Sequence, residues 1–320
     1  MILPFPICVI NKERLFICKK ADKAKKMTLF LETLIQGISL GSIYALIALG
    51  YTMVYGIAKM LNFAHGDIIM VGAYVIYTTV SMATLPSWLG VIISIVFCSA
   101  LGITIEFLAY KPLRGAPSLN VLITAIGVSY FLQNLALLIF GGNQKSVPKI
   151  DMSFLDFKIG DTLSVSGETV FTILLTIVLM VALTLFINKT KLGKAMRAVS
   201  EDRAAAQLMG INVNRTITVT FAIGSALAAF ASLCYGMNYS YIKPTTGSMP
   251  GIKAFTAAVF GGIGSISGAM FGGFLMGIFE KLSSAYISSS LTDAIVFGVL
   301  IVMLIVRPTG LLGKKMNEKV

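Results

Sequence analysis

Charged residues are scarce in this sequence, and their scarcity decides the class of protein. Only 12% of the 320 residues are charged, whereas 56% are hydrophobic and the mean hydropathy is +0.86. A water-soluble domain carries roughly twice that share of charge, because its surface must stay hydrated. The chain is therefore predicted to lie in a lipid bilayer.

Residues and motifs that carry chemistry are equally few. The sequence holds one histidine, and it has no G-x-x-x-x-G-K-[ST] phosphate loop, no H-E-x-x-H motif and no pair of carboxylates at helical spacing. The pairs Gly193-Lys194 and Gly313-Lys314 lack both the upstream glycine and the following Ser or Thr of a phosphate loop. No enzymatic centre, metal site or cofactor is predicted, and energy from ATP must come from another subunit.

Cysteine is also too sparse to build a framework. The four cysteines, Cys8, Cys18, Cys98 and Cys234, form no C-x-x-C pair, and two of them lie within apolar runs. This usage argues against a disulfide scaffold and against a structural zinc site.

Long apolar runs are what the sequence does have. Each is continuous over about twenty residues, whereas the strands of a membrane β-barrel alternate over about ten. Helices also satisfy every backbone polar group inside lipid. We therefore predict an all-α, polytopic integral membrane protein with runs near 30–50, 65–83, 88–110, 118–140, 168–188, 216–240, 252–281 and 291–307.

The basic residues lie between these runs and set the predicted orientation. The net charge of +12 does not indicate nucleic acid binding, because the bases do not gather with aromatic residues on one face. By the positive-inside rule the cytoplasmic segments are those around Lys111 and Arg114, the loop 189–215 and the C-terminal tail. The polar stretch 141–167, with balanced charge, is predicted to be a solvated loop on the outer side.

Counting crossings shows that two runs must be broken if the basic segments are to share one side. A straight helix over 252–281 would measure about 45 Å, well beyond a hydrocarbon core of about 30 Å. The same difficulty arises near the N-terminus, where polar residues interrupt 51–67. Two related halves, each with one interrupted pair, give about eight full spans and about ten crossings. The glycines predicted to break the second run are Gly261, Gly262, Gly264 and Gly268.

Two interpretations of these breaks remain open. Discontinuous helices at matching places in two halves indicate a transport pathway. Alternatively, the glycines only allow close helix packing, as the patterns Gly37-x-x-x-Gly41 and Gly273-x-x-x-Gly277 also indicate.

Residues 1–26 form a separate N-terminal extension. A short apolar stretch precedes the basic residues, which is the reverse order of a signal peptide. The extension is interpreted as a disordered tail or as sequence upstream of a true start at Met27. The membrane domain is then 27–313, followed by a cytoplasmic tail at 314–320.

The loop 189–215 carries a short amphipathic segment with paired small residues. Its centre resembles the E-A-A-x-x-x-G loop of ABC importer permeases, with Ala205 and Ala206 in the alanine places and Gly210 in the glycine place, although Ala204 stands where that motif has Glu. The resemblance implies that 200–211, with Ala204 and Ile211, is a coupling helix that docks on an ATP-binding subunit. The alternative is an interfacial helix on anionic lipid.

Several further motifs in the same order resemble the permeases of branched-chain amino acid ABC importers, over about 28–313. Within that family the chain is more similar to the shorter of the two paired permeases of the high-affinity system. The motifs are Asn62-Phe63-Ala64-His65-Gly66-Asp67, Thr124-Ala125-Ile126-Gly127, Phe131-Leu132-Gln133-Asn134, Gly210-Ile211-Asn212, Lys253-Ala254-Phe255-Thr256-Ala257-Ala258-Val259, Gly261-Gly262-Ile263-Gly264-Ser265 and Arg307-Pro308-Thr309-Gly310-Leu311-Leu312-Gly313.

The resemblance implies a transport complex in the plasma (inner) membrane of a bacterium or archaeon. Its other members would be a second related permease, two ATP-binding subunits and an extracytoplasmic solute-binding protein. It does not fix the solute, because related importers take other amino acids, short amides or urea. A secondary transporter or channel without ATP, and a purely structural membrane subunit, are the other classes considered.

Polar residues inside apolar runs are the predicted lining of the translocation path, because ionisable groups at membrane depth are costly unless they face a cavity or a partner. An equally reasonable interpretation is that they bond neighbouring helices and orient the break. Glu106 is instead expected to be a helix-end partner of the nearby Lys111 and Arg114. The predicted path residues are Asn62, His65, Asp67, Thr124, Gln133 and Asn134, with Ser129 considered beside them.

Overall fold

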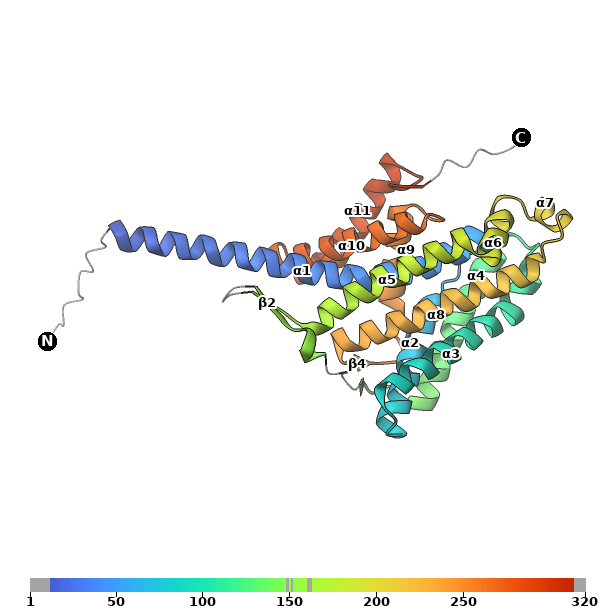
Figure 1. The fold of residues 1–320 in the computed structure, drawn as a ribbon, viewed down its shortest axis with the longest axis horizontal. Coiled ribbons are helices and arrows are strands. Elements are labelled where there is room, and N and C mark those ends of the chain that lie inside the picture. Colours follow the sequence, from blue (N-terminus) through green and yellow to red (C-terminus); the bar gives the residue numbers. More distant parts are fainter. Residues whose placement is uncertain (1–11, 148–149, 151, 160–162, 314–320) are drawn as a thin grey trace.

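The computed structural model describes residues 12–147, 150, 152–159 and 163–313. Within them the chain forms a bundle of helices with two small two-stranded sheets (Figure 1). The α-helices are α1 (Lys12–Ala58), α2 (His65–Tyr77), α3 (Ser87–Ile105), α4 (Ser118–Phe140), α5 (Gly167–Lys189), α6 (Lys191–Glu201), α7 (Arg203–Leu208), α8 (Val213–Tyr239), α9 (Ser248–Gly261), α10 (Ile266–Tyr286) and α11 (Thr292–Val306). The shorter helical turns are the π-helices η1 (Thr78–Met82) and η2 (Glu106–Tyr110) and the 3₁₀-helices η3 (Lys111–Leu113), η4 (Ser153–Leu155) and η5 (Ser289–Leu291).

Six helical segments of the described residues are long and apolar enough to cross a membrane. They are Lys26–Ala58, Ser87–Leu113, Ser118–Phe140, Gly167–Lys189, Val213–Tyr239 and Ser289–Val306. The expectation of about eight full spans and ten crossings is not confirmed by this number. The chain is a multi-pass α-helical membrane protein, and α2 and α9 are shorter helices between its spans.

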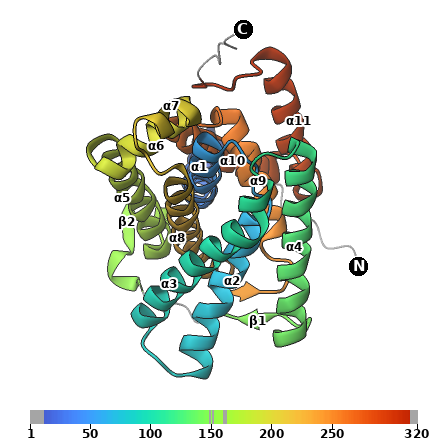
Figure 2. The same cartoon turned by 90° about the vertical axis from the view of Figure 1, so that its right-hand side faces the viewer.

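Helix α1 forms the centre of the bundle. The end-on view of Figure 2 places it inside a ring of other helices, with α4, α5 and α11 at the periphery. Its most apolar window is 78% buried, against 17% for α4 and 11% for α11. The side chains from Ile43 to Leu49 are almost fully enclosed. The outer helices expose the apolar side chains that a lipid-facing surface requires.

Small residues allow α1 and α10 to approach backbone to backbone. A Cβ atom placed on Gly277 would lie 2.2 Å from the Gly41 nitrogen, and one placed on Gly41 would lie 2.7 Å from the Phe274 Cα. Only hydrogen fits at such a crossing, which is the packing that the two small-x-x-x-small patterns favour. These glycines therefore serve helix packing.

We call the end of the bundle that carries Arg114, Arg203 and Arg215 the basic end. Helix α1 reaches it at Ala58, where Arg203 of α7 contacts that residue's carbonyl. The predicted extra crossing within 51–67 is wrong, because residues 51–58 continue α1 and the six residues 59–64 that follow are too few to span. The N-terminal part of α1 consequently lies at the opposite end of the bundle (Figure 1).

Residues 12–26 of the predicted extension belong to α1, whereas 1–11 and the tail 314–320 lie outside the described residues. The predicted solvated loop 141–167 lies at the end opposite the basic end and contributes three strands: β1 (Lys145–Ser146), β2 (Phe157–Ile159) and β3 (Leu163–Val165). Strand β1 pairs antiparallel with β4 (Tyr241–Ile242), with Lys145 opposite Ile242, and β2 pairs with β3, with Phe157 opposite Val165. The loop is thereby tied to the turn that precedes α9.

Candidate functional site

The first helix break lies between Ala58 and His65. Lys59 adopts a left-handed backbone with φ +52°, which ends α1, and its N–H donates to the Tyr55 carbonyl. Within the break Asn62 is buried, and its Oδ1 accepts a 2.8 Å hydrogen bond from the Tyr110 hydroxyl. Asn62 therefore holds the break against the end of η2.

His65 is packed inside the bundle. Its ring meets the edge of Tyr51 at 4.9 Å between centroids, and a Cβ on Gly50 would lie 2.2 Å from its Nε2. That nitrogen is buried and has no hydrogen-bond partner in the described residues. Glycine at position 50 is what lets the ring fit beside α1.

Asp67 faces a different neighbour, helix α4. Its carboxylate accepts hydrogen bonds from the Ser129 hydroxyl and, at 2.9 Å, from the Gln133 amide. The same amide group lies 3.1 Å from the Ser248 hydroxyl of α9. Three helices thus place four polar side chains together, and we call Asp67, Ser129, Gln133 and Ser248 the Asp67 cluster.

The Asp67 cluster sits where two short helices begin side by side. Helices α2 and α9 are so close there that a Cβ on Gly251 would lie 2.9 Å from the Gly66 Cα. Asp67 is only 1% exposed, and the side chains that bond its carboxylate in the described part of the chain are uncharged donors. A buried carboxylate without a cation is costly, and Asp67 is therefore a candidate functional residue.

The other predicted path residues of α4 do not join this cluster. Thr124 is half-buried, and its nine-residue separation from Gln133 places it on the other side of the helix at about 100° per residue. Asn134 is exposed, and its amide donates to the Tyr130 carbonyl of its own helix at 2.8 Å. Ser248 was missed by sequence reasoning, because it precedes the recognised motif and is brought in only by the course of α9.

The second break lies between α9 and α10. Gly262 and Gly264 have φ angles of +107° and +94°, a region that L side chains rarely adopt. Gly261 and Gly268 face each other across the turn, since a Cβ on Gly261 would lie 1.9 Å from the Gly268 oxygen. The Ser265 hydroxyl then caps α10 by accepting from the Gly268 N–H.

The C-terminal segment completes this second break. The N–H groups of Leu311 and Leu312 donate to the carbonyls of Phe260 and Gly261 at 3.0 and 2.9 Å. Carbonyls in the last turn of a helix lack partners within the helix, so these bonds satisfy the end of α9. The motif Arg307 to Gly313 therefore fastens the break from outside.

Helix α7 lies in the predicted coupling loop and is capped at both ends. The Asp202 carboxylate accepts from the Ala205 N–H at 3.0 Å, and Gly210 turns the chain with φ +80°. Ala204 and Ala205 are exposed and Ile211 is half-buried, whereas Ala206 is buried at 4% exposure.

The most prominent apolar side chains of this loop are ones that sequence reasoning missed. Leu208 is 89% exposed and Met209 is 82% exposed. Together these two side chains form an exposed apolar surface at the C-terminal end of α7. The sequence feature that could have identified them is the presence of two large hydrophobic residues shortly after the three alanines of the same polar loop.

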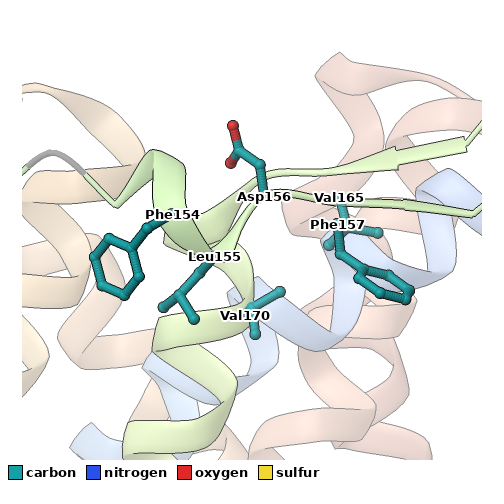
Figure 3. Close-up of a pocket in the computed structure, with 6 residues that line it drawn as sticks. All are labelled: Phe154, Leu155, Asp156, Phe157, Val165 and Val170. Carbon is teal, nitrogen blue, oxygen red and sulfur yellow. The ribbon is translucent and has the colours of Figure 1, made fainter.

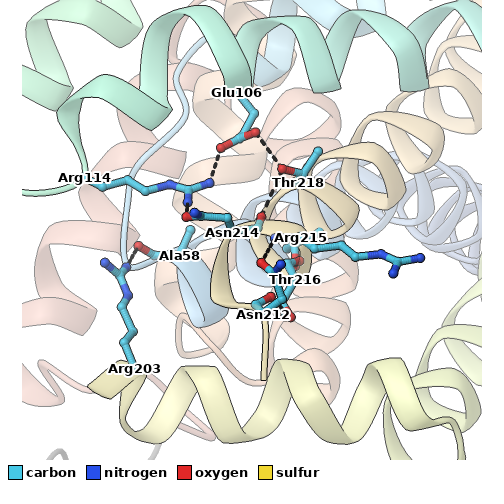
Figure 4. Close-up of polar contacts among 10 residues, drawn as sticks. Ala58, Glu106, Arg114, Arg203, Asn212, Asn214, Arg215, Thr216 and Thr218 are labelled. Atoms are coloured by element: carbon cyan, nitrogen blue, oxygen red, sulfur yellow. Dashed lines mark hydrogen bonds and ion pairs between the residues drawn. The ribbon is translucent and has the colours of Figure 1, made fainter. Parts of the chain in front are cut away.

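A polar network joins the other elements of the basic end (Figure 4). Glu106 is the helix-end partner expected for Arg114, with which it forms an ion pair. Arg114 also donates to the Asn214 side chain, and the Glu106 carboxylate accepts from the Thr218 hydroxyl at 2.8 Å. The end of α3 is in this way held against the start of α8.

A second ionic network, also missed from the sequence, fixes α9 to its neighbours. The Lys253 ammonium lies 2.7 Å from a carboxylate oxygen of both Glu280 and Asp293. The Tyr44 hydroxyl donates to Glu280 at 2.8 Å. The four residues come from α9, α10, α11 and α1, so only the tertiary structure brings them together.

A hollow of about 400 Å³ lies at the far end from these breaks. Figure 3 shows its lining, which is Phe154, Leu155, Asp156, Phe157, Val165 and Val170. The Asp156 carboxylate accepts from the Gly167 N–H at 2.6 Å and so fixes the start of α5. The hollow contains none of the predicted site residues.

Comparisons with known proteins place this sequence among transport permeases. The sequence profile described as branched-chain amino acid transport system / permease component matches residues 33–304. The chain is 46% identical to the high-affinity branched-chain amino acid transport system permease protein LivH of Salmonella typhimurium, over 91% of this chain and 98% of that protein. It is 43% identical to the corresponding protein BraD of Pseudomonas aeruginosa, with the same two coverages of 91% and 98%.

A more distant relative carries a different name. The fructose import permease protein FruG of Bifidobacterium longum is 28% identical over 80% of this chain and 78% of that protein. The curated relatives are transport permeases and not enzymes. Given the family match and these identities, the chain belongs to the permease family of branched-chain amino acid transport systems.

Proposed function

We propose that this chain is the permease subunit of an ATP-driven importer for branched-chain amino acids and forms the translocation path by alternating access. The observation that carries the proposal is the 46% identity to a high-affinity branched-chain amino acid permease along nearly its whole length. Two broken helix pairs in the membrane bundle support it, because such breaks occur where solutes cross.

The proposed complex contains two ATP-binding subunits, a second related permease and an extracytoplasmic solute-binding protein. The absence of a phosphate loop from the sequence supports a separate source of ATP hydrolysis. We place the complex in the plasma membrane of a bacterium or archaeon, with the basic end and the C-terminus in the cytoplasm, because the loop 189–215 and the bases around Lys111 and Arg114 lie at that end. The basic residues of 12–26 lie at the opposite end, at the start of α1.

We propose that α7 docks into a groove of an ATP-binding subunit. The exposed faces of Ala204 and Ala205 let the helix approach closely, while Leu208 and Met209 supply apolar area for the contact. Ala206 faces inward and supports the loop itself. An acidic substitution at Ala206 would therefore disturb the permease fold before it altered docking.

We propose that the Asp67 cluster lines the path and receives the ammonium group of the amino acid. In the described part of the chain the Asp67 carboxylate is bonded by uncharged hydroxyl and amide donors, so no bonded cation there competes with an ammonium group for it. Asn62 and His65 support the break beside it. Thr124 and Asn134 lie elsewhere on α4 and are proposed only as neighbours of the path.

A different solute is the first alternative to a branched-chain amino acid. The relative named as a fructose importer indicates that this architecture serves chemically different solutes. Another amino acid, a short amide or urea is the alternative cargo, and an ATP-independent transporter is the alternative mechanism. The two mechanisms differ in their need for an ATP-binding subunit.

The test is uptake of labelled leucine into liposomes that contain the chain either alone or with its companion subunits. We expect no ATP hydrolysis and no accumulation with the chain alone, and ATP-dependent accumulation with the full complex. Accumulation by the isolated chain would refute the importer assignment, and uptake of urea or an amide without leucine would correct the cargo.

The docking role is tested with Leu208→Glu, using Leu192→Glu as the control because Leu192 is an exposed apolar residue of the same loop region. Loss of a central interface side chain costs about 2 kcal/mol or more, so we expect Leu208→Glu to lose most of the copurifying ATP-binding subunit. Equal copurification for both variants would exclude docking through Leu208.

A further inference from the structure

Arg203 connects the predicted coupling helix to the centre of the bundle. It is the first residue of α7, and its guanidinium donates to the backbone carbonyl of Ala58, the last residue of α1 (Figure 4). The two residues are 145 positions apart in the chain. The contact is therefore a tertiary bridge between a loop helix and the central helix.

The chemistry of this contact favours a strong bond. Carbonyls at the end of a helix have no partner within it and carry the negative end of the helix dipole. A guanidinium placed there makes a charge-assisted hydrogen bond. Burial lowers the pKa of Arg203 from its ordinary value, and the charge of Arg114 lowers it further. The bond to the Ala58 carbonyl therefore holds the guanidinium at a place where burial and the charge of Arg114 both disfavour its own charge.

The bridge ends at the break that precedes the Asp67 cluster. The chain leaves α1 directly after Ala58 and is fastened again at Asn62 by Tyr110. Asp67 follows in the first turn of α2. The short segment 59–64 is thus held on one side by α7 and on the other by η2, and the path residues come immediately after it.

We propose that Arg203 is the positioning residue that ties α7 to α1, so that displacement of α7 by the ATP-binding subunit moves the end of α1, the break with Asn62, and the start of α2 with His65 and Asp67. The proposal rests on the proposed function of this chain. It adds a specific structural connection, from Arg203 to Ala58, between the docking surface and the translocation path.

The orientation of the side chain separates this role from docking. Leu208 and Met209 point outward at 89% and 82% exposure, whereas Arg203 is half-buried and turns toward α1. A residue that served the partner surface would lie with the first group. The two functions therefore use opposite sides of one short helix.

The test uses the complete transporter with Arg203→Ala, and Arg197→Ala as the matched control. Arg197 lies on the neighbouring helix α6 and is exposed, and its substitution by alanine removes the same positive charge. The measurements are copurification of the ATP-binding subunit, the rate of ATP hydrolysis, and labelled leucine accumulated per ATP hydrolysed in liposomes. Arg203→Lys keeps a cation that can reach a carbonyl, and it serves as the conservative variant.

For Arg203→Ala we expect normal copurification and continued ATP hydrolysis, with leucine moved per ATP reduced about tenfold, a usual size for coupling between two sites. Arg203→Lys should recover part of this ratio, and Arg197→Ala should not change it. If Arg203→Ala does not reach the membrane, Arg203→Gln, which retains a donor without charge, is measured in its place and is expected to lower the ratio.

Three results would overturn the inference. A normal ratio in Arg203→Ala, or in Arg203→Gln where that variant replaces it, would show that the bridge does not transmit movement. Loss of the ATP-binding subunit from the variant alone would make Arg203 part of the docking surface. Absence of an ATP-binding subunit from the unsubstituted complex would instead remove the proposed function on which the inference rests.

Discussion

Substitution of Gly262 by alanine probes the second helix break most directly. Position 262 has φ +107°, and a Cβ there would lie 2.4 Å from the Gly313 nitrogen and 2.7 Å from its Cα. Backbone strain at such an angle costs about 1–3 kcal/mol for a residue with a side chain. The close contact with the C-terminal segment adds about 1–3 kcal/mol of overpacking. We expect Gly262→Ala to lose about 2–6 kcal/mol of stability, the sum of these two terms.

Gly264→Ala is the matched comparison for this prediction. Its φ of +94° carries a similar strain, but the nearest heavy atom to an added Cβ is the Gly56 Cα at 3.9 Å, which is ordinary contact. Only the strain of about 1–3 kcal/mol should therefore appear. The difference between the two variants isolates the contact with the C-terminal segment.

The assay combines thermal unfolding of the purified transporter with leucine uptake at matched membrane levels. Gly262→Ala should unfold at a lower temperature than Gly264→Ala and should transport less. The larger Gly262→Val and Gly264→Val substitutions should both abolish uptake. Equal unfolding temperatures for the two alanine variants, or full uptake with both glycines replaced by valine, would refute the reasoning.

Two further substitutions test the polar networks. Asp67→Asn keeps the size of the side chain and an oxygen acceptor, so the free energy of unfolding should change by only about 1 kcal/mol. Leucine uptake should fall about tenfold or more, because the charge is lost. Full uptake by this variant would exclude a charge requirement. Lys253→Met leaves Glu280 and Asp293 without their buried cation and should lower the free energy of unfolding by about 3–5 kcal/mol. The control Lys281→Met, at a half-buried position of α10, should lower it much less in the same thermal unfolding measurement. Equal unfolding temperatures for the two variants would show that the ion triad does not stabilise the bundle.

Local features of this protein were predictable from adjacent residues. Continuous apolar runs require helices in lipid, and glycines next to polar residues mark where a helix ends. The sequence accordingly predicted interruptions near Asn62 and around Gly262. It also paired Glu106 with Arg114, because both lie within a few turns of the same helix end.

The contacts that connect the elements could not be predicted in this way. Arg203 and Ala58 are 145 residues apart, and the link depends on where the end of α1 lies relative to α7. The inward face of Ala206 likewise follows from how the loop packs on the bundle. A pattern of small residues shows that a close approach is possible, but it does not show which side of the helix makes it.

The sequence by itself determined that this chain is a multi-pass membrane permease, because composition, apolar length and motif order are properties of neighbouring residues. Only the tertiary structure decided that Ser248 completes the Asp67 cluster and that Lys253, Glu280, Asp293 and Tyr44 form one network across four helices. Those groups meet because helices that are distant in the sequence pack side by side in space. The free energy of that packing comes from many contacts between distant residues, and the pattern of neighbouring residues does not specify them.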